Sequence, residues 1–217
     1  MANLAMVGVE MLLPLYIQNI RGESAFHSGL MLLPGAMMMG IMSLITGRLF
    51  DRFGARYLGL TGLTLLTIGT IPFLTLTAET PTLSIIIFYA IRLFGISMVF
   101  MPVTTSGMNV LPIQEMSHGT AVNNTFRQVL SSIGTAVMTT ILTNATNASK
   151  PAKSLLTTNP LQFKDDMINA SLAGFHAAFG MAILFAVIAF ILSLYLKPGN
   201  RARESKLNQF KQGGAQA

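Results

Sequence analysis

The sequence contains no cysteine and no tryptophan, and only 10% of its 217 residues are charged. Without cysteine, a disulfide framework and a thiolate metal site are excluded. A water-soluble domain carries about 25% charged residues, so the shortage of charge indicates that most of the surface faces something other than water. Because 52% of the residues are hydrophobic, we expect that surroundings to be the interior of a lipid bilayer.

The motifs of soluble enzymes are missing as well. The sequence has no HExxH pair, no glycine-rich phosphate loop and no nucleophile elbow. Its three histidines, His27, His118 and His176, lie in different regions of the chain. We therefore expect no enzymatic activity, no metal site and no cofactor.

Six long apolar segments occupy most of the chain. A membrane-spanning helix needs about 20 mainly apolar residues. Segments of this kind lie near residues 2–20, 28–46, 57–76, 83–107, 119–143 and 172–196. The predicted fold is an all-α membrane protein with six transmembrane helices in one domain, residues 1–197. A basic tail, residues 198–217, is predicted to be disordered.

The net charge of +6 comes largely from the tail and from the segment GRLFDRFGAR, residues 47–56, between the second and third apolar segments. These basic residues are not interleaved with aromatic residues on a soluble face, which argues against nucleic acid as a partner. Short basic connections stay on the cytoplasmic side of a membrane. The pattern predicts that both termini are cytoplasmic. The polar connection 144–171, with Pro151 and Pro160, is predicted to be an exposed external loop.

Three ionisable side chains, Glu10, Arg92 and Arg127, fall inside apolar segments. A charge at the bilayer centre costs about 2.5–3.5 kcal/mol on insertion scales, so each should face a cavity or a partner. Glu10 is a candidate for proton exchange or for attracting a lipophilic cation; alternatively, it only pairs with a nearby arginine. Arg92 either holds a carboxylate such as Glu10, lines a central cavity, or snorkels to the outer surface.

The fifth apolar segment carries a polar stripe at three- and four-residue steps. Its members are Asn124, Gln128, Ser131, Thr135 and Thr139, and Arg127 flanks it. In a membrane, such a stripe must face protein or an aqueous cavity. Two interpretations stay open: the stripe lines a cavity, or it makes hydrogen bonds between helices.

The segment GRLFDRFGAR resembles the G-x-L-x-D-R-x-G-x-R turn of the major facilitator superfamily. The matching residues are Gly47, Leu49, Asp51, Arg52, Gly54 and Arg56. The stretches LPLYIQNIRGESAFHSGLMLLPG and SHGTAVNNTFRQVLSSIGTAV are similar to the C-terminal half of the fourteen-helix drug:proton antiporters of the EmrB/QacA type. The resemblance covers residues 4–197.

The resemblance implies that the chain forms the C-terminal bundle of a bacterial cell-membrane transporter. It implies export of a lipophilic small molecule, either a drug or a lipophilic cation. Export would proceed by alternating access and would be driven by a proton gradient. The turn residues would latch the cytoplasmic side, with Asp51 capping a helix N-terminus. The candidate proton or substrate cavity comprises Glu10, Arg92, Asn124, Arg127, Gln128 and Ser131.

Part of the family pattern is missing from the chain. A complete antiporter has a second half with its own turn motif, and substrate sites lie between two such repeats. This chain offers one wall of the cavity, so the expected partners include the missing N-terminal half as well as membrane lipids and protons. Two other functions stay open: a non-transporting six-helix membrane interaction module, and an exporter of a lipid or metabolite.

Overall fold

The computed structural model describes residues 2–108, 111–152 and 159–195, and within these residues all regular structure is helical. The long helices are α1 (Ala2–Asn19), α2 (Ala25–Thr70), α3 (Thr82–Met108), α4 (Met116–Ala148) and α6 (Pro160–Leu194). Two short 3-10 helices, η1 (Ile71–Thr75) and η2 (Ile113–Glu115), precede α3 and α4. The predicted all-α fold is confirmed, whereas the predicted tail, residues 198–217, lies outside the described residues.

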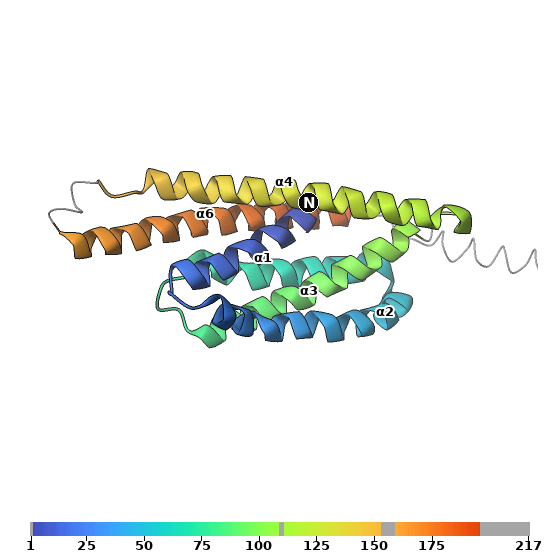
Figure 1. The fold of residues 1–217 in the computed structure, drawn as a ribbon. Helices are drawn as coiled ribbons and strands as arrows, with labels where there is room; N and C mark the ends of the chain where they lie inside the picture. Colours follow the sequence, from blue (N-terminus) through green and yellow to red (C-terminus); the bar gives the residue numbers. More distant parts are fainter. Residues whose placement is uncertain (1, 109–110, 153–158, 196–217) are drawn as a thin grey trace, which may run out of the picture.

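Helix α2 contains a sharp bend at which the chain reverses. Gly54 has φ 78° and ψ 167°, far from the right-handed helical region, and a positive φ favours glycine because glycine has no Cβ. Figure 1 shows the second arm of α2 running back toward the end at which the first arm begins. The segment 47–56, expected to be a turn between spans, is therefore helical apart from this bend.

Four segments of the described residues are long and apolar enough to cross a membrane. They are Ala25–Phe50, Arg56–Thr75, Thr82–Phe100 and Pro160–Leu194. The other two predicted spans, 2–20 and 119–143, also form helices, as parts of α1 and α4. Helix α1 is interrupted by Asn3 and Glu10, and α4 is less apolar than the other helices because it contains many Ser, Thr and Asn residues. Their polar side chains therefore need partners within the bundle.

The connection between α4 and α6 is much shorter than the predicted loop. Residues 144–171 were expected to be an exposed loop, but α4 continues to Ala148 and α6 begins at Pro160. The side chain of Asn159 accepts a hydrogen bond of 3.4 Å from the backbone N–H of Gln162 and so caps α6. Proline suits the first turn of a helix, where its missing N–H is not needed. Asn159 and Pro160 together are thus a helix start.

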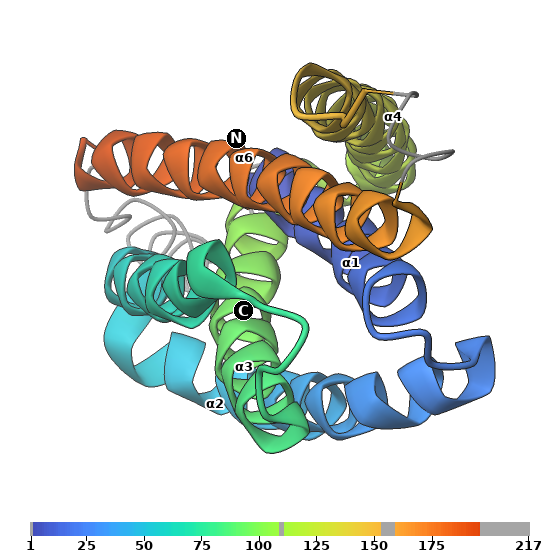
Figure 2. The ribbon, with the colours of Figure 1, turned by 90° about the vertical axis from the view of Figure 1, so that its left-hand side faces the viewer.

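All five long helices contribute to one apolar core. Figures 1 and 2 show α4 and α6 side by side, and α1 packs against both. Two aromatic pairs pack within it: the ring centroids of Tyr16 and Phe175 are 5.8 Å apart, and those of Phe73 and Phe179 are 5.5 Å apart. This core holds α1 against α6, and with it the polar residues of α1.

The second arm of α2 and α3 approach each other through glycine. A Cβ built on Gly62 would lie 2.7 Å from the carbonyl oxygen of Gly95, and one built on Gly95 would lie 2.6 Å from the carbonyl oxygen of Gly62. A Cβ on Gly69 would lie 2.8 Å from the backbone nitrogen of Arg92. Small residues let membrane helices approach this closely. The contact places Arg92 directly against α2.

Candidate functional site

Arg92 connects three helices inside the bundle, and its side chain is completely buried. Its Nε donates a hydrogen bond of 3.2 Å to Thr70 Oγ1 on α2. Its Nη2 donates to the carbonyl oxygens of Ala5 and Met6 on α1, at 2.8 Å and 3.0 Å. The buried position excludes snorkelling to the outer surface, one of the three interpretations that the sequence allows.

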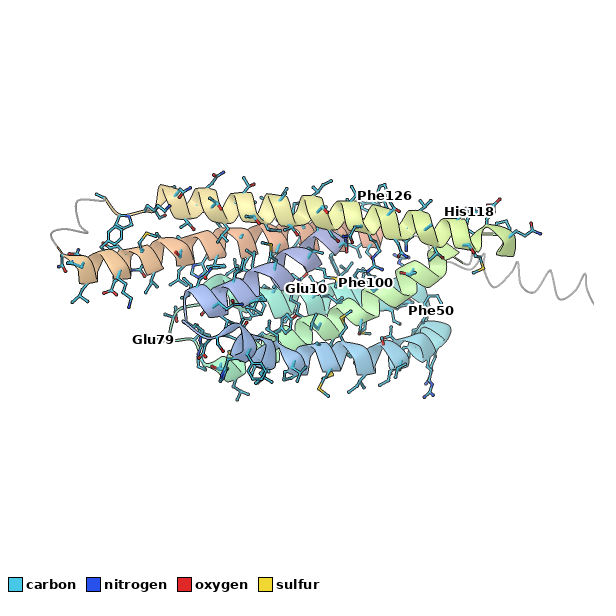
Figure 3. All side chains as sticks on the ribbon, viewed as in Figure 1. Glu10, Phe50, Glu79, Phe100, His118 and Phe126 are labelled. Carbon is cyan, nitrogen blue, oxygen red and sulfur yellow. The ribbon has the colours of Figure 1, made fainter. Side chains whose placement is uncertain are left out.

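Glu10 lies on α1 near Arg92, with a half-buried side chain. Its carboxyl group lies within electrostatic range of the side chains of Arg92 and Tyr89, both on α3. Among the described residues, Glu10 makes no ion pair with Arg92. Arg92 Nη1 is also without a hydrogen-bond partner there. Figure 3 shows Glu10 in the middle of the bundle, far from Glu79 at one end and Phe50 at the other.

Asn3 fastens α1 to α4. Its Nδ2 donates hydrogen bonds of 3.0 Å to the carbonyl oxygen of Arg127 and to Ser131 Oγ. Asn3 and Glu10 are seven residues apart, so they share a face of α1. The same face therefore carries the carboxyl group and the amide that holds α4.

Arg127 reaches from α4 to α3. Its Cζ lies 4.2 Å from the centroid of the Phe100 ring, which is a cation–π contact. Such contacts stabilise by about 0.5–1 kcal/mol when exposed and by about 2 kcal/mol when desolvated. Both side chains are half-buried, so we expect a value between these limits. Few other contacts join α3 and α4.

The polar stripe of α4 divides into two parts. Ser131, Thr135 and Thr139 are half-buried, and Thr139 Oγ1 lies 3.7 Å from Met11 Sδ on α1. Asn124 and Gln128 are exposed. Hydrogen bonding between helices therefore accounts for Ser131, whereas the exposed Asn124 and Gln128 leave part of the N-terminal half of α4 open to another surface.

Comparison with known proteins decides the family. The sequence profile of the Major Facilitator Superfamily matches residues 1–135. The uncharacterized MFS-type transporter YcnB of Bacillus subtilis is 44% identical over 202 residues, which cover 93% of this chain. The chain belongs to the Major Facilitator Superfamily. This membership confirms the resemblance at the level of the superfamily, whose members are transporters rather than enzymes.

Two further superfamily relatives carry names that refer to resistance. The lincomycin resistance protein LmrB of Listeria innocua is 39% identical over 86% of the chain. The multidrug resistance protein Stp of Mycobacterium tuberculosis is 28% identical over 64% of the chain. The matches span 40% of YcnB and 38% of LmrB, so the chain corresponds to well under half of these relatives. The fourteen-helix type and the C-terminal position stay predictions.

The superfamily turn lies at the bend of α2. Gly47 and Arg52 are in helical conformation, Gly54 forms the bend, and the exposed Arg52 has its Cζ 5.5 Å from the Phe53 ring centroid. Arg56 Nη2 donates a hydrogen bond of 3.1 Å to the carbonyl oxygen of Leu194 at the end of α6. The side chain of Asp51 lies outside the described side chains, so its predicted helix-capping role stays a prediction.

A second cluster of side chains, at the opposite end of the bundle, has no signal in the sequence. Tyr16 donates to the carbonyl oxygen of Thr77, Arg21 Nη1 donates to that of Thr80 at 2.7 Å, and a ring nitrogen of His176 lies 2.7 Å from that of Leu76. The connection between η1 and α3 is thus held through its backbone by α1, by Arg21 just beyond α1, and by α6. Since every residue has a carbonyl oxygen, no residue type marks such acceptors.

The described residues contain no group of three or more His, Cys, Asp or Glu side chains that could hold a metal ion. The polar groups that the structure brings together are instead Glu10, Tyr89 and Arg92 on one side and Asn3, Arg127 and Ser131 on the other. Both groups involve α1. This helix is therefore the element around which the candidate site is built.

Proposed function

We propose that this chain is the C-terminal six-helix bundle of a proton-coupled exporter of lipophilic small molecules that works by alternating access in the bacterial cell membrane. The observation that carries the proposal is the position of Glu10. Its half-buried carboxyl group lies near a fully buried arginine that keeps one donor, Nη1, unpaired among the described residues. A charged group of this kind inside a membrane is a functional-site hypothesis by default.

The position of Glu10 supports a protonation-dependent attraction between α1 and α3. When Glu10 is deprotonated, its carboxylate is attracted to the free Nη1 of Arg92. When Glu10 takes up a proton, this attraction is lost, while Arg92 keeps its hydrogen bonds to Ala5 and Met6. A proton can therefore shift the balance between two arrangements of the bundle, because it binds one of them better than the other.

The substrate class rests on the relatives. LmrB and Stp are named for resistance to lincomycin and to multiple drugs, which supports a small organic molecule as the cargo of this chain. Substrate sites of such transporters lie between two repeats. The exposed Asn124 and Gln128 on α4 are polar groups available to a cavity shared with the missing half.

The superfamily turn is proposed to act as the cytoplasmic latch. Arg56 already connects the bend of α2 to the end of α6, so movement of the bend would be transmitted to α6. Asp51 is proposed to cap a helix N-terminus, where a carboxylate is favourable. Replacing Asp51 by Asn should reduce transport without preventing folding.

The experiment uses a chimera in which this chain replaces the matching segment of YcnB. Inverted membrane vesicles with an imposed pH gradient would be tested for drug uptake, using drugs to which the chimera confers resistance. We expect Glu10→Gln to abolish gradient-driven uptake but to leave downhill exchange of the drug in place, because the carboxyl group is needed only for the proton.

The control is Glu79→Gln, which removes an exposed carboxyl group in the connection between η1 and α3. Glu79→Gln should transport as the parent chimera does. Gradient-driven uptake that survives Glu10→Gln would exclude Glu10 as the proton site. A chimera that reaches the membrane and moves no drug would contradict the transport proposal itself.

A further inference from the structure

The guanidinium of Arg127 is seated on an aromatic face without being anchored there. A guanidinium has five N–H donors. Among the described residues, the side chain of Arg127 makes no hydrogen bond and no ion pair, and its Cζ lies 4.2 Å from the centroid of the Phe100 ring. Arg92 is different, since three of its bonds go to named protein oxygens. Within the described part of the chain, the Phe100 ring is thus what holds the Arg127 guanidinium.

The backbone that carries this side chain is held in place. Asn3 Nδ2 donates to the carbonyl oxygen of Arg127 and to Ser131 Oγ, both at 3.0 Å. The side chain of Arg127 can therefore leave the Phe100 ring by rotating about its own bonds, while α1, α3 and α4 keep their positions. Because Arg127 is half-buried, its guanidinium has an open side into which it can move.

The charge balance favours replacement by another cation. The described site contains one carboxyl group, Glu10, and two arginines, Arg92 and Arg127. A second cation added beside these groups would be repelled, but a cation that takes the place of Arg127 on the ring leaves the charge in contact with the ring unchanged. The negative face of an aromatic ring attracts cations and gives a neutral molecule no such attraction.

We propose that the face of the Phe100 ring is a subsite for an organic cation, and that Arg127 is the internal occupant that this ligand displaces. The inference rests on the proposed function and deepens it, since it assigns particular residues of the same site to the binding of the substrate. Binding of the cation needs no proton gradient, however, because the displacement of Arg127 is an equilibrium between two cations that compete for the ring. Removal of Arg127 should therefore strengthen cation binding instead of weakening it.

The test is equilibrium dialysis of tetraphenylphosphonium with the purified 217-residue chain in lipid nanodiscs. We expect Arg127→Ala to bind tetraphenylphosphonium roughly three- to tenfold more tightly than the parent chain, the range set by losing one competing cation–π contact. Phe100→Leu keeps an apolar side chain but has no ring face, so it should weaken binding. In the Phe100→Leu background, Arg127→Ala should give no gain.

Two controls separate the ring from general electrostatics. Lys164→Ala removes an exposed positive charge from α6 and should leave binding unchanged. Triphenylphosphine oxide, which is neutral, should not distinguish Arg127→Ala from the parent chain. The proposal is overturned if Arg127→Ala binds the cation no more tightly, if it binds none, or if the gain persists without the Phe100 ring.

A second measurement covers variants that fold poorly. The sequence contains no tryptophan, so Phe100→Trp places a single indole emitter at the subsite and retains an aromatic face. Its emission should change saturably on addition of tetraphenylphosphonium, and at lower concentration when Arg127 is also replaced by Gln. An emission that does not respond overturns the subsite. If Glu10→Gln does not stop gradient-driven transport, Glu10 is excluded as the proton site. That outcome does not affect the proposed cation subsite at the Phe100 ring.

Discussion

Arg56, just beyond the bend of α2, donates a hydrogen bond of 3.1 Å from Nη2 to the carbonyl oxygen of Leu194, which ends α6. The last carbonyl groups of a helix have no partner within that helix and carry a partial negative charge. An arginine suits this position on both grounds. The contact joins the superfamily turn to the last helix of the bundle.

Replacing Arg56 by Gln should increase local opening of the last turn of α6 and should have only a small effect on the free energy of unfolding of the whole chain. The bond is exposed, so we expect a loss of about 1 kcal/mol or less in the free energy of unfolding. Hydrogen–deuterium exchange should become faster in the last turn of α6. Arg48→Gln, which also removes an exposed arginine of the turn, is the control. Equal exchange in the two variants would contradict the role of Arg56.

Replacing Arg92 by Lys should destabilise the bundle although the charge is kept. A lysine cannot reach Thr70 and two carbonyl oxygens of α1 at once, so buried acceptors lose their donor. We expect a loss of roughly 2–4 kcal/mol, measured by unfolding of the purified chain. Thr70→Val removes only the partner of Nε and should cost about 1 kcal/mol. If the two variants are equally stable, Arg92 does not connect the helices.

Replacing Gly62 by Ala should push α2 and α3 apart, because the new Cβ would lie 2.7 Å from the carbonyl oxygen of Gly95. Overpacking of this kind costs roughly 1–3 kcal/mol. Gly40→Ala is the matched control, since a Cβ there has nothing within 4 Å. The midpoint temperature of thermal unfolding should be lowered by Gly62→Ala and not by Gly40→Ala. A Gly62→Ala variant as stable as Gly40→Ala would mean that the two backbones are not in contact.

The orientation can be tested with single cysteines, because the chain has none of its own. Figure 3 places Phe50 and Glu79 near opposite ends of the bundle. The positive-inside rule predicts that Arg48→Cys is labelled by an impermeant reagent only from the cytoplasmic side and Glu79→Cys only from outside. Labelling of both positions from the same side would refute the predicted topology.

Much of the fold follows from local sequence. Apolar runs of sufficient length predict helices, and the glycine of the turn motif is the residue at which α2 bends. The ends of the helices were less predictable. Proline occurs both in loops and at the first helical position, and for Pro160 only its place after the capping Asn159 distinguishes the two. The loop expected over 144–171 was wrong for this reason.

The sequence by itself determined that the chain is helical, apolar and a member of its superfamily, since run length, composition and motif spacing are properties of neighbouring residues. Tertiary structure alone decided that Arg92 donates to carbonyl groups of Ala5 and Met6, and that Arg127 lies on the Phe100 ring. Periodicity shows which face of a helix is polar, but not which helix lies opposite it. Backbone acceptors occur at every residue, so only the packing of α1 against its neighbours selects them.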